Sequence, residues 1–96
     1  MIQVWKQRLG IEDWEILTER INPEQVEYSG EDYFIGISRN FDIKKAIIYH
    51  DIDLCEDSIV HELMHIVFPQ KNESFDEYEK FIDKISKDTI LLYQMN

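Results

Sequence analysis

Apolar residues near the start of the chain recur with two different spacings, which predict a helix and then a strand. Residues 1 to 9 place their apolar side chains on one side of a helix, and Gly10 can supply the left-handed cap that ends it. Residues 13 to 21 alternate in the way a strand requires, although Leu17 and Ile21 blur the period of two. A helix is therefore the alternative for this second segment.

The next segments have the composition of strands joined by turns. Residues 33 to 38 and 44 to 49 are the clearer strands, and the short segment 39 to 42 between them predicts a hairpin. Residues 25 to 28 lie between two turns and predict a weaker strand. The sequence thus predicts a small, mostly antiparallel sheet of three to four strands.

Two longer segments have the apolar spacing of helices. Asp53 is a candidate N-cap, and Glu56 three residues later would complete a capping box for a helix that Pro69 stops. A last helix is expected to begin at Asn72 or Ser74. Its apolar stripe consists of Phe75, Tyr78, Ile82, Ile85, Thr89 and Leu92.

These elements predict one α+β domain over residues 1–96, with a helix at each end, a small sheet and a further helix before the last one. A chain of 96 residues is too short for two domains, and its 44% of hydrophobic residues can bury a small core. The formal net charge of -10 repels phosphate groups, so we expect no nucleic-acid partner. The sequence lacks both a long apolar run and a secretory start, so we expect no membrane insertion and a cytoplasmic location.

The candidate chemistry lies in the segment His61-Glu62-Leu63-Met64-His65. On a helix, residues four apart project from one face, so the two imidazoles can bind one metal ion. Zinc accepts such nitrogen ligands and, in catalytic sites, keeps a water molecule beside three protein ligands. Glu62 is turned by about 100° from His61 and can accept a proton from that water as general base, then return it to the leaving amine as general acid. The segment predicts one Zn²⁺ ion and metal-assisted hydrolysis.

The surroundings of this segment strengthen the prediction. A polar triplet within an otherwise apolar helix is costly to bury unless something satisfies it, and a metal ion does so. The alternative is a buried helix whose histidines are hydrogen-bonded without a metal. The flanking uncharged residues are Ile59, Val60, Leu63, Met64, Ile66 and Val67.

The third metal ligand has to come from another element. If the chain reverses around residues 69 to 72, positions equally far from the turn face each other. Glu73 would then face His65 and complete the metal shell, whereas Glu77 would face His61 and fix its tautomer.

Other assignments remain open for these acidic residues. Ser74 and Glu77 can instead form a capping box, which needs no metal. We favour Glu73 over Glu77 as the ligand, with Glu79 and Asp76 behind them because they are farther from the facing turn or shorter. We expect His50 to be a surface histidine at a strand end.

Several segments together resemble the minigluzincins, which are small relatives of the gluzincin zinc metallopeptidases. The resemblance rests on the Trp14 segment, residues 45–49, residues 59–65 and the Glu-bearing helix that follows. It implies a glutamate ligand on that helix, in agreement with Glu73. It also implies an acidic residue four positions later, where Glu77 stands, although aspartate is commoner at that position.

The resemblance further implies a latent zymogen, in which a C-terminal segment blocks the cleft. Residues 86 to 96 would be that segment, either within one chain or by helix exchange in a homodimer. Packing of this segment on the chain's own core is equally consistent with its apolar residues.

The leading functional prediction is a zinc-dependent endopeptidase whose substrate lies extended along the strand that ends at Tyr49. One alternative is a non-catalytic interaction or regulatory domain that keeps zinc for structure, since a metal can supply folding energy at this size. Another is a processing peptidase dedicated to one partner protein. Tyr33, Tyr49 and Tyr93 can each offer a hydroxyl to the transition state, and the sequence favours none of them.

Overall fold

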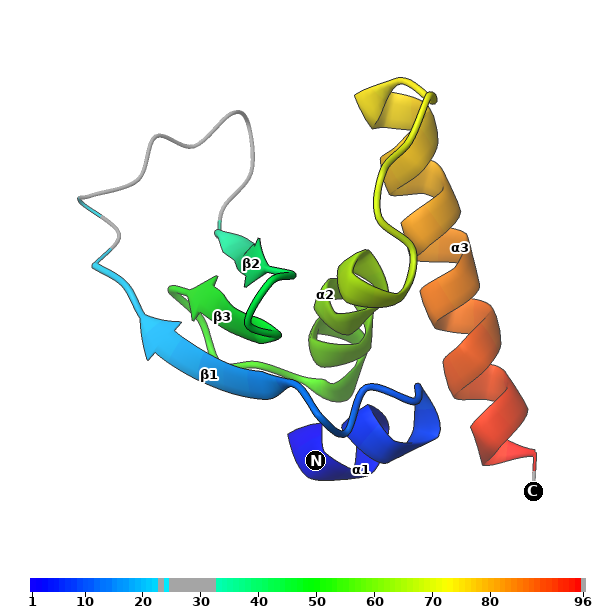
Figure 1. Ribbon diagram of the computed structural model, residues 1–96, viewed down its shortest axis with the longest axis horizontal. Coiled ribbons are helices and arrows are strands. Elements are labelled where there is room, and N and C mark those ends of the chain that lie inside the picture. Colours follow the sequence, from blue (N-terminus) through cyan, green and yellow to red (C-terminus); the bar gives the residue numbers. More distant parts are fainter. Residues whose placement is uncertain (23, 25–32, 96) are drawn as a thin grey trace.

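A computed structural model describes residues 1–22, 24 and 33–95 of the chain. The elements follow in the order helix, three strands and two helices, which confirms the α+β prediction. Figure 1 shows α2 between the sheet on one side and α3 on the other. The elements are α1 (Ile2–Arg8), β1 (Glu15–Arg20), β2 (Ile35–Asn40), β3 (Lys45–His50), α2 (Glu56–Val67) and α3 (Phe75–Gln94).

The sheet has the strand order β1-β3-β2, so the last strand in sequence lies at its centre. β2 and β3 form the expected antiparallel hairpin, whereas β1 pairs with β3 in parallel. One of the two pairings thus departs from the mostly antiparallel prediction. The hairpin brings β3 beside β2 through a short turn, and β1, which is joined by no such turn, takes the other edge of β3. The weak strand predicted at residues 25 to 28 lies outside the described residues.

The end of α1 confirms the role predicted for Gly10. This residue has a φ of 71°, the left-handed conformation that glycine adopts without steric cost. Its N–H donates to the carbonyl of Gln7, and the N–H of Ile11 donates to the carbonyl of Lys6. These two bonds form a Schellman motif, which turns the chain so that Ile11 enters the core.

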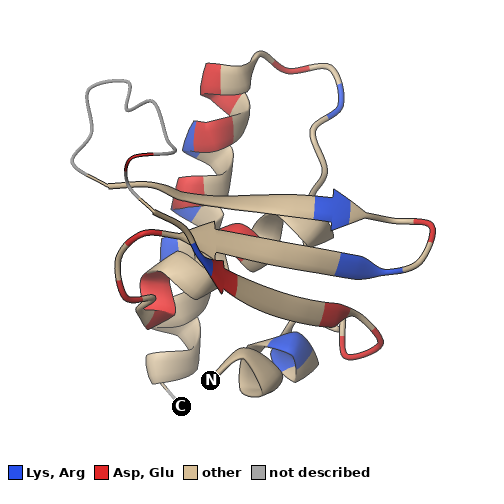
Figure 2. Ribbon diagram, turned by 90° about the vertical axis from the view of Figure 1, so that its left-hand side faces the viewer, with Lys and Arg blue, Asp and Glu red and all other residues tan. Residues whose placement is uncertain are grey.

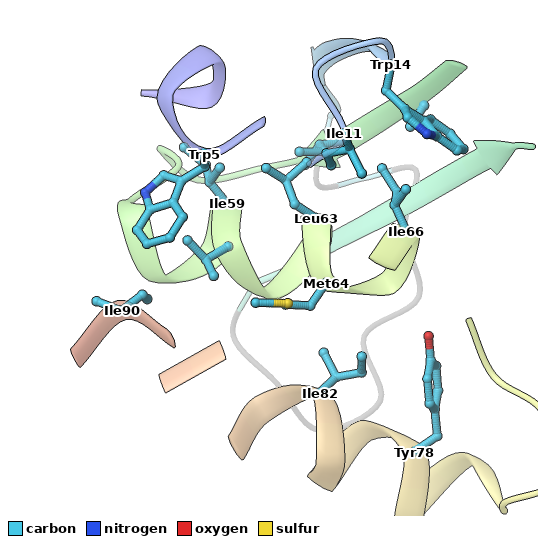
Figure 3. Close-up of a cluster of buried hydrophobic side chains, with 13 residues drawn as sticks. Trp5, Ile11, Trp14, Ile59, Leu63, Met64, Ile66, Tyr78, Ile82 and Ile90 are labelled. Carbon is cyan, nitrogen blue, oxygen red and sulfur yellow. The ribbon is translucent and has the colours of Figure 1, made fainter. Parts of the chain in front are cut away.

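The core surrounds α2, which is buried on most of its circumference. Figure 3 shows side chains of α2 meeting Trp5 of α1 and Ile82 of α3. Such a position explains why apolar residues flank His61 and His65 on nearly every side of this helix. The buried hydrophobic residues of α2 are Ile59, Val60, Leu63, Met64 and Ile66.

The predicted start of α2 is corrected by the structure. Cys55 is the N-cap, without a side-chain capping bond, and the helix begins at Glu56. Asp53 instead accepts a hydrogen bond from Arg20 of β1 at 2.7 Å. The charge-assisted hydrogen bond between the Arg20 guanidinium and the Asp53 carboxylate joins two elements, so the local sequence pattern around Asp53 does not predict it.

The C-terminal helix begins as predicted but buries a shifted stripe. Ser74 is the N-cap and accepts a hydrogen bond from the backbone N–H of Glu77. Phe75 and Leu92, both placed on the predicted stripe, are 66% and 62% exposed. The buried stripe is shifted around the helix relative to the predicted one, because α3 contacts α2 over only part of its length and contacts α1 near its C-terminal end. The buried residues of α3 are Tyr78, Ile82, Ser86 and Ile90.

The described part of the predicted inhibitory segment, residues 86 to 95, meets the chain's own α1 through Tyr93. The Tyr93 ring meets the Trp5 ring edge to face at 5.3 Å, and the Arg8 guanidinium lies within 5 Å of both rings. Ile90 is buried beside them. No helix within the described residues is both long enough and apolar enough to cross a bilayer.

Candidate metal centre

Three side chains with metal-binding atoms converge where α2 faces α3. His61 and His65 lie one turn apart on α2, and Glu79 reaches them from α3. The Nε2 atoms of His61 and His65 each lie 3.3 Å from one oxygen of the Glu79 carboxylate. The ligand atoms of all three residues lie within 4.8 Å of one another.

Tyr78 sets the proton position on His65. The Tyr78 hydroxyl donates to the carbonyl oxygen of Phe68 at 2.6 Å, which uses its single proton. It also lies 3.0 Å from His65 Nδ1, so it must accept a hydrogen bond from an Nδ1–H group there. The neutral ring then has a lone pair on Nε2, on the side of Glu79. Tyr78 is buried and points from α3 toward the end of α2 (Figure 3).

This arrangement leaves two acceptors facing each other. Burial lowers the pKa of His65 to about 4, with the charges of His61 and Arg39 as further causes, so the ring is neutral near pH 7. Its Nε2 lone pair then lies 3.3 Å from a Glu79 oxygen with no proton to share. Two ligand atoms bound 2.0–2.1 Å from a tetrahedral zinc ion lie about 3.3 Å apart. The two distances from the histidines to the Glu79 carboxylate are compatible with a metal ion held by these three side chains.

Glu62 lies beside this cluster and is only 6% exposed. The pKa of its carboxyl is raised to about 8, mainly by burial and also by the negative charge of Glu79, while the positive charge of Arg39 opposes the increase. A carboxyl group with this raised pKa can exchange a proton near neutral pH.

Asp83 extends the cluster by one helical turn. Its Oδ1 atom lies 4.0 Å from His61 Nδ1, and its Oδ2 atom pairs with Lys87 at 2.9 Å. Acidic and basic positions alternate along this part of α3 (Figure 2). Asp83 stands four residues after Glu79, which is the spacing and residue type that the minigluzincin resemblance implies.

Glu79 takes the position that the symmetric-hairpin argument assigned to Glu73. The Glu73 carboxylate instead accepts hydrogen bonds from the backbone N–H groups of Lys71 and Asn72, both at 3.2 Å. Hydrogen bonding to its own backbone N–H, and to those of Lys71 and Asn72, holds the pKa of Glu73 below its usual value. The structure does not bring Glu73 into the histidine cluster.

Glu77 also lies away from the position predicted for it beside His61. Its backbone N–H donates to Ser74, as the capping interpretation requires, and its side chain is exposed. Asp83 is the acidic residue near His61 instead. His50 lies at the end of β3, with Nδ1 2.7 Å from the carbonyl oxygen of Ile52, and it is not part of the cluster.

The shift from Glu73 to Glu79 has a simple geometric cause. His65 and Glu79 are equally far from position 72, and so are His61 and Asp83. The facing pairs are therefore symmetric about residue 72, the last residue of the predicted turn 69 to 72, whereas the predicted pairs were symmetric about its first residue, Pro69. α2 ends at Val67 and α3 begins only at Phe75, so several connecting residues displace the facing positions.

The cluster opens into a cleft of about 640 Å³ between β2 and the two helices. Ile35, Gly36 and Ile37 line it from β2. Of the three tyrosines considered from the sequence, Tyr33 lines this cleft, whereas Tyr93 packs on α1. Tyr49 lies on the central strand.

Two residues of the site were missed in the sequence. The sequence pattern predicts core packing for Tyr78 and a turn between strands for Arg39, and it indicates neither as a site residue. The one available signal is that Tyr78 directly precedes Glu79. The Tyr78 hydroxyl can reach a ligand on α2 only if Glu79 also faces α2. Nothing local indicated Arg39, which reaches α2 from another element.

Comparisons with protein-family models, with curated proteins and with solved structures gave no match. The resemblance to minigluzincins therefore stays a prediction from the sequence.

Proposed function

We propose that this protein is a zinc-dependent endopeptidase of the minigluzincin type. The observation that carries the proposal is the contact between His65 Nε2, whose tautomer Tyr78 sets, and the Glu79 carboxylate. A buried imidazole acceptor held against a half-buried carboxylate in this way is costly unless a cation lies between them.

His61, His65 and Glu79 would hold the zinc ion. Bound zinc would supply a Lewis acid that polarises a peptide carbonyl and acidifies a water molecule, and a positive charge that favours the ionised form of Glu62. Two imidazoles and one carboxylate are the ligand set of known zinc peptidases.

Glu62 would move the proton in the reaction. As a carboxylate it accepts a proton from the water molecule that attacks the peptide carbonyl. The protonated Glu62 then returns this proton to the nitrogen of the leaving amine, which departs as a neutral group. The low exposure of Glu62 keeps competing water away from the transfer.

We propose a different substrate strand from the one expected from the sequence. β3, which ends at His50, pairs with β1 on one side and with β2 on the other, so its backbone has no free edge. β2 pairs with β3 along one edge, and its residues 35 to 37 line the cleft. We therefore propose that an extended peptide adds to the edge of β2 that pairs with no other described strand.

The first test is metal content and hydrolysis by the full chain. We expect one zinc ion per chain by elemental analysis and cleavage of an unfolded casein substrate that a chelator abolishes. Glu62→Gln should keep the zinc and lose at least about 100-fold in kcat, since it cannot accept the proton. A Glu62→Gln variant as active as the wild type would contradict the role of Glu62.

Glu79→Ala and Glu77→Ala form a matched pair for the third ligand. Glu79→Ala should lose bound zinc, because it removes a side chain that faces both histidines. Glu77→Ala should keep it, because that side chain is exposed. The opposite result would show that the register of α3 in the site is different.

The rival proposals predict other outcomes. A zinc-stabilised regulatory domain would bind the metal and melt at a higher temperature with it, but would cleave no peptide. A dedicated processing peptidase would leave casein intact and cleave only its partner. A cytoplasmic location and helix exchange in a homodimer stay predictions from the sequence.

A further inference from the structure

Arg39 connects the edge strand to the helix that carries the histidines. It is the fifth residue of β2, and its Nη1 atom donates a hydrogen bond to the carbonyl oxygen of His65 at 2.7 Å. α2 ends at Val67, so this carbonyl is one of the last four, which have no partner within the helix. The bond therefore holds the guanidinium beside one of the candidate metal ligands.

The guanidinium has donors left for a ligand. An arginine side chain carries five N–H donors in a rigid, planar arrangement. The bond to the His65 carbonyl uses one of them, and a hydrogen bond to the Tyr78 hydroxyl uses another. Arg39 also lines the cleft together with Glu62 and Tyr78.

The other charged side chains around the cleft are acidic. Among the described residues that line it, Arg39 is the single lysine or arginine. A reaction that develops negative charge in such surroundings is disfavoured unless positive charge lies close to it, and Arg39 would add to the charge that a bound zinc ion supplies. The acidic residues of the cleft are Asp57, Glu62, Glu79 and Asp83.

Peptide hydrolysis develops negative charge of this kind. The water oxygen forms a bond to the carbonyl carbon while its proton moves to Glu62, and the π electrons of the carbonyl move onto the carbonyl oxygen. When the C–N bond breaks, that electron pair re-forms the carbonyl, and the bond electrons leave with the nitrogen, which takes the proton from Glu62. The oxyanion exists only between these two steps, so a group that binds it raises kcat more than it lowers KM.

We propose that Arg39 is a catalytic residue whose guanidinium binds this oxyanion, while its bond to the His65 carbonyl holds it in place. The inference rests on the proposed peptidase function, and it names the stabilising group that the sequence left open between three tyrosines. The rival explanation is purely structural, with Arg39 serving only to cap the end of α2.

Two substitutions separate these explanations. Arg39→Gln keeps an N–H donor for the His65 carbonyl but removes the charge, whereas Arg39→Lys keeps the charge. We expect Arg39→Gln to lose about 100-fold or more in kcat on a casein-derived peptide, with KM changed less than about threefold and zinc retained. Arg39→Lys should recover part of kcat. Equal kcat values for Arg39→Gln and the wild type would overturn the inference and leave the proposed peptidase function intact.

A binding measurement tests the inference without turnover. A phosphonamidate peptide carries a tetrahedral, anionic centre in place of the scissile bond, and its affinity for the zinc-loaded protein can be measured by calorimetry. Arg39→Gln should weaken this binding by about 30-fold or more. The affinity of the corresponding uncharged peptide is measured in the inactive Glu62→Gln background, and adding Arg39→Gln there should not change it. Equal phosphonamidate affinity, or no binding by the wild type, would overturn the inference.

The binding experiment also separates the two proposals. A wild type that cleaves nothing would contradict the peptidase function, and the phosphonamidate affinities would still decide whether Arg39 recognises the anion. Arg20→Gln is the matched control, because Arg20 is exposed and pairs with Asp53 outside the cleft. It should change neither kcat nor the phosphonamidate affinity. If Arg39→Gln fails to fold or to bind zinc, Arg39→Lys decides the question. An Arg39→Lys variant with wild-type stability but no more than about 1% of wild-type kcat would show that charge at this position is insufficient, and the inference would fail.

Discussion

At the scale of single residues, the hydroxyl of Tyr78 determines which nitrogen of His65 faces Glu79. Phe at this position would keep the ring but leave His65 Nδ1 and the Phe68 carbonyl without this partner. We expect Tyr78→Phe to weaken zinc binding by about 10- to 100-fold and to lower the free energy of unfolding by about 1–3 kcal/mol. Competition with a chromophoric chelator and urea titration measure the two effects.

The control for this substitution is Tyr93→Phe. The Tyr93 hydroxyl makes a single long hydrogen bond of 3.4 Å to the carbonyl of Arg8, away from the cluster. Zinc affinity should be unchanged in this variant. If Tyr78→Phe also binds zinc as tightly as the wild type, Tyr78 does not set the tautomer of a ligand.

Glu62 makes the stability of the metal-free protein depend on pH. Its pKa is about 8 in the fold against an ordinary value of 4.5, so the folded state holds the proton more tightly than the unfolded state does. The stabilisation is fully present below 4.5 and is lost as the pH rises through 8. His65 acts in the opposite direction, because its pKa falls from 6.5 to about 4 and its contribution is lost as the pH falls through that range.

Glu62→Gln isolates the first of these effects, since His65 is present in both proteins. We expect the metal-free variant to gain stability relative to the metal-free wild type between about pH 5 and about pH 8, by on the order of 2–4 kcal/mol. Urea unfolding in the presence of a chelator at the two pH values measures this. A difference that does not change with pH would mean that Glu62 is more hydrated than the structure indicates.

At the scale of elements, the start of α3 was predictable because capping is local. The Ser74 hydroxyl accepts a hydrogen bond from the Glu77 N–H at 3.2 Å. Ser74→Ala should lower the free energy of unfolding by about 1 kcal/mol, whereas Ser74→Asp should keep the wild-type value because aspartate caps equally well. Thermal and urea unfolding of the three proteins provide the comparison, and equal stability of the alanine and aspartate variants would exclude a capping role.

The register between α2 and α3 was not predictable in the same way. Helical periodicity states which residues of one helix share a face, but it does not state which turn of the next helix lies opposite. The connection from Phe68 to Ser74 contains the Glu73 carboxylate bonded to backbone N–H groups, and this local structure sets where α3 begins. Glu79 therefore occupies the place that a symmetric hairpin assigned to Glu73.

At the scale of the whole molecule, the last turns of α3 connect the two ends of the chain. Ile90 is 7% exposed and Leu91, its neighbour, is 57% exposed. Ile90→Ala should lower the free energy of unfolding by about 2–4 kcal/mol, and Leu91→Ala by no more than about 0.5 kcal/mol. Urea titration distinguishes the two.

The same pair of variants addresses latency. Residues 86 to 95 meet α1 through Tyr93 and do not line the described cleft, so loosening them should not raise the rate of peptide cleavage. A rise in activity of Ile90→Ala without zinc loss would instead support the inhibitory segment that the minigluzincin resemblance implies.

The sequence by itself determined the features that depend on neighbouring residues. His61, Glu62 and His65 share a helix because apolar residues recur around them with helical spacing, and Gly10 and Ser74 end and begin helices through local bonds. These features follow from one turn of backbone, so a pattern of a few residues specifies them.

Only the tertiary structure decided which distant residues meet. Glu79, Asp83 and Tyr78 reach α2 because of the packing of α3, and Arg39 reaches it because β2 lies at the edge of the sheet beside the cleft. The parallel pairing of β1 with β3 was decided in the same way. Contacts between elements depend on the length of each connection and on how the core packs, and neither is written in the periodicity of a single segment.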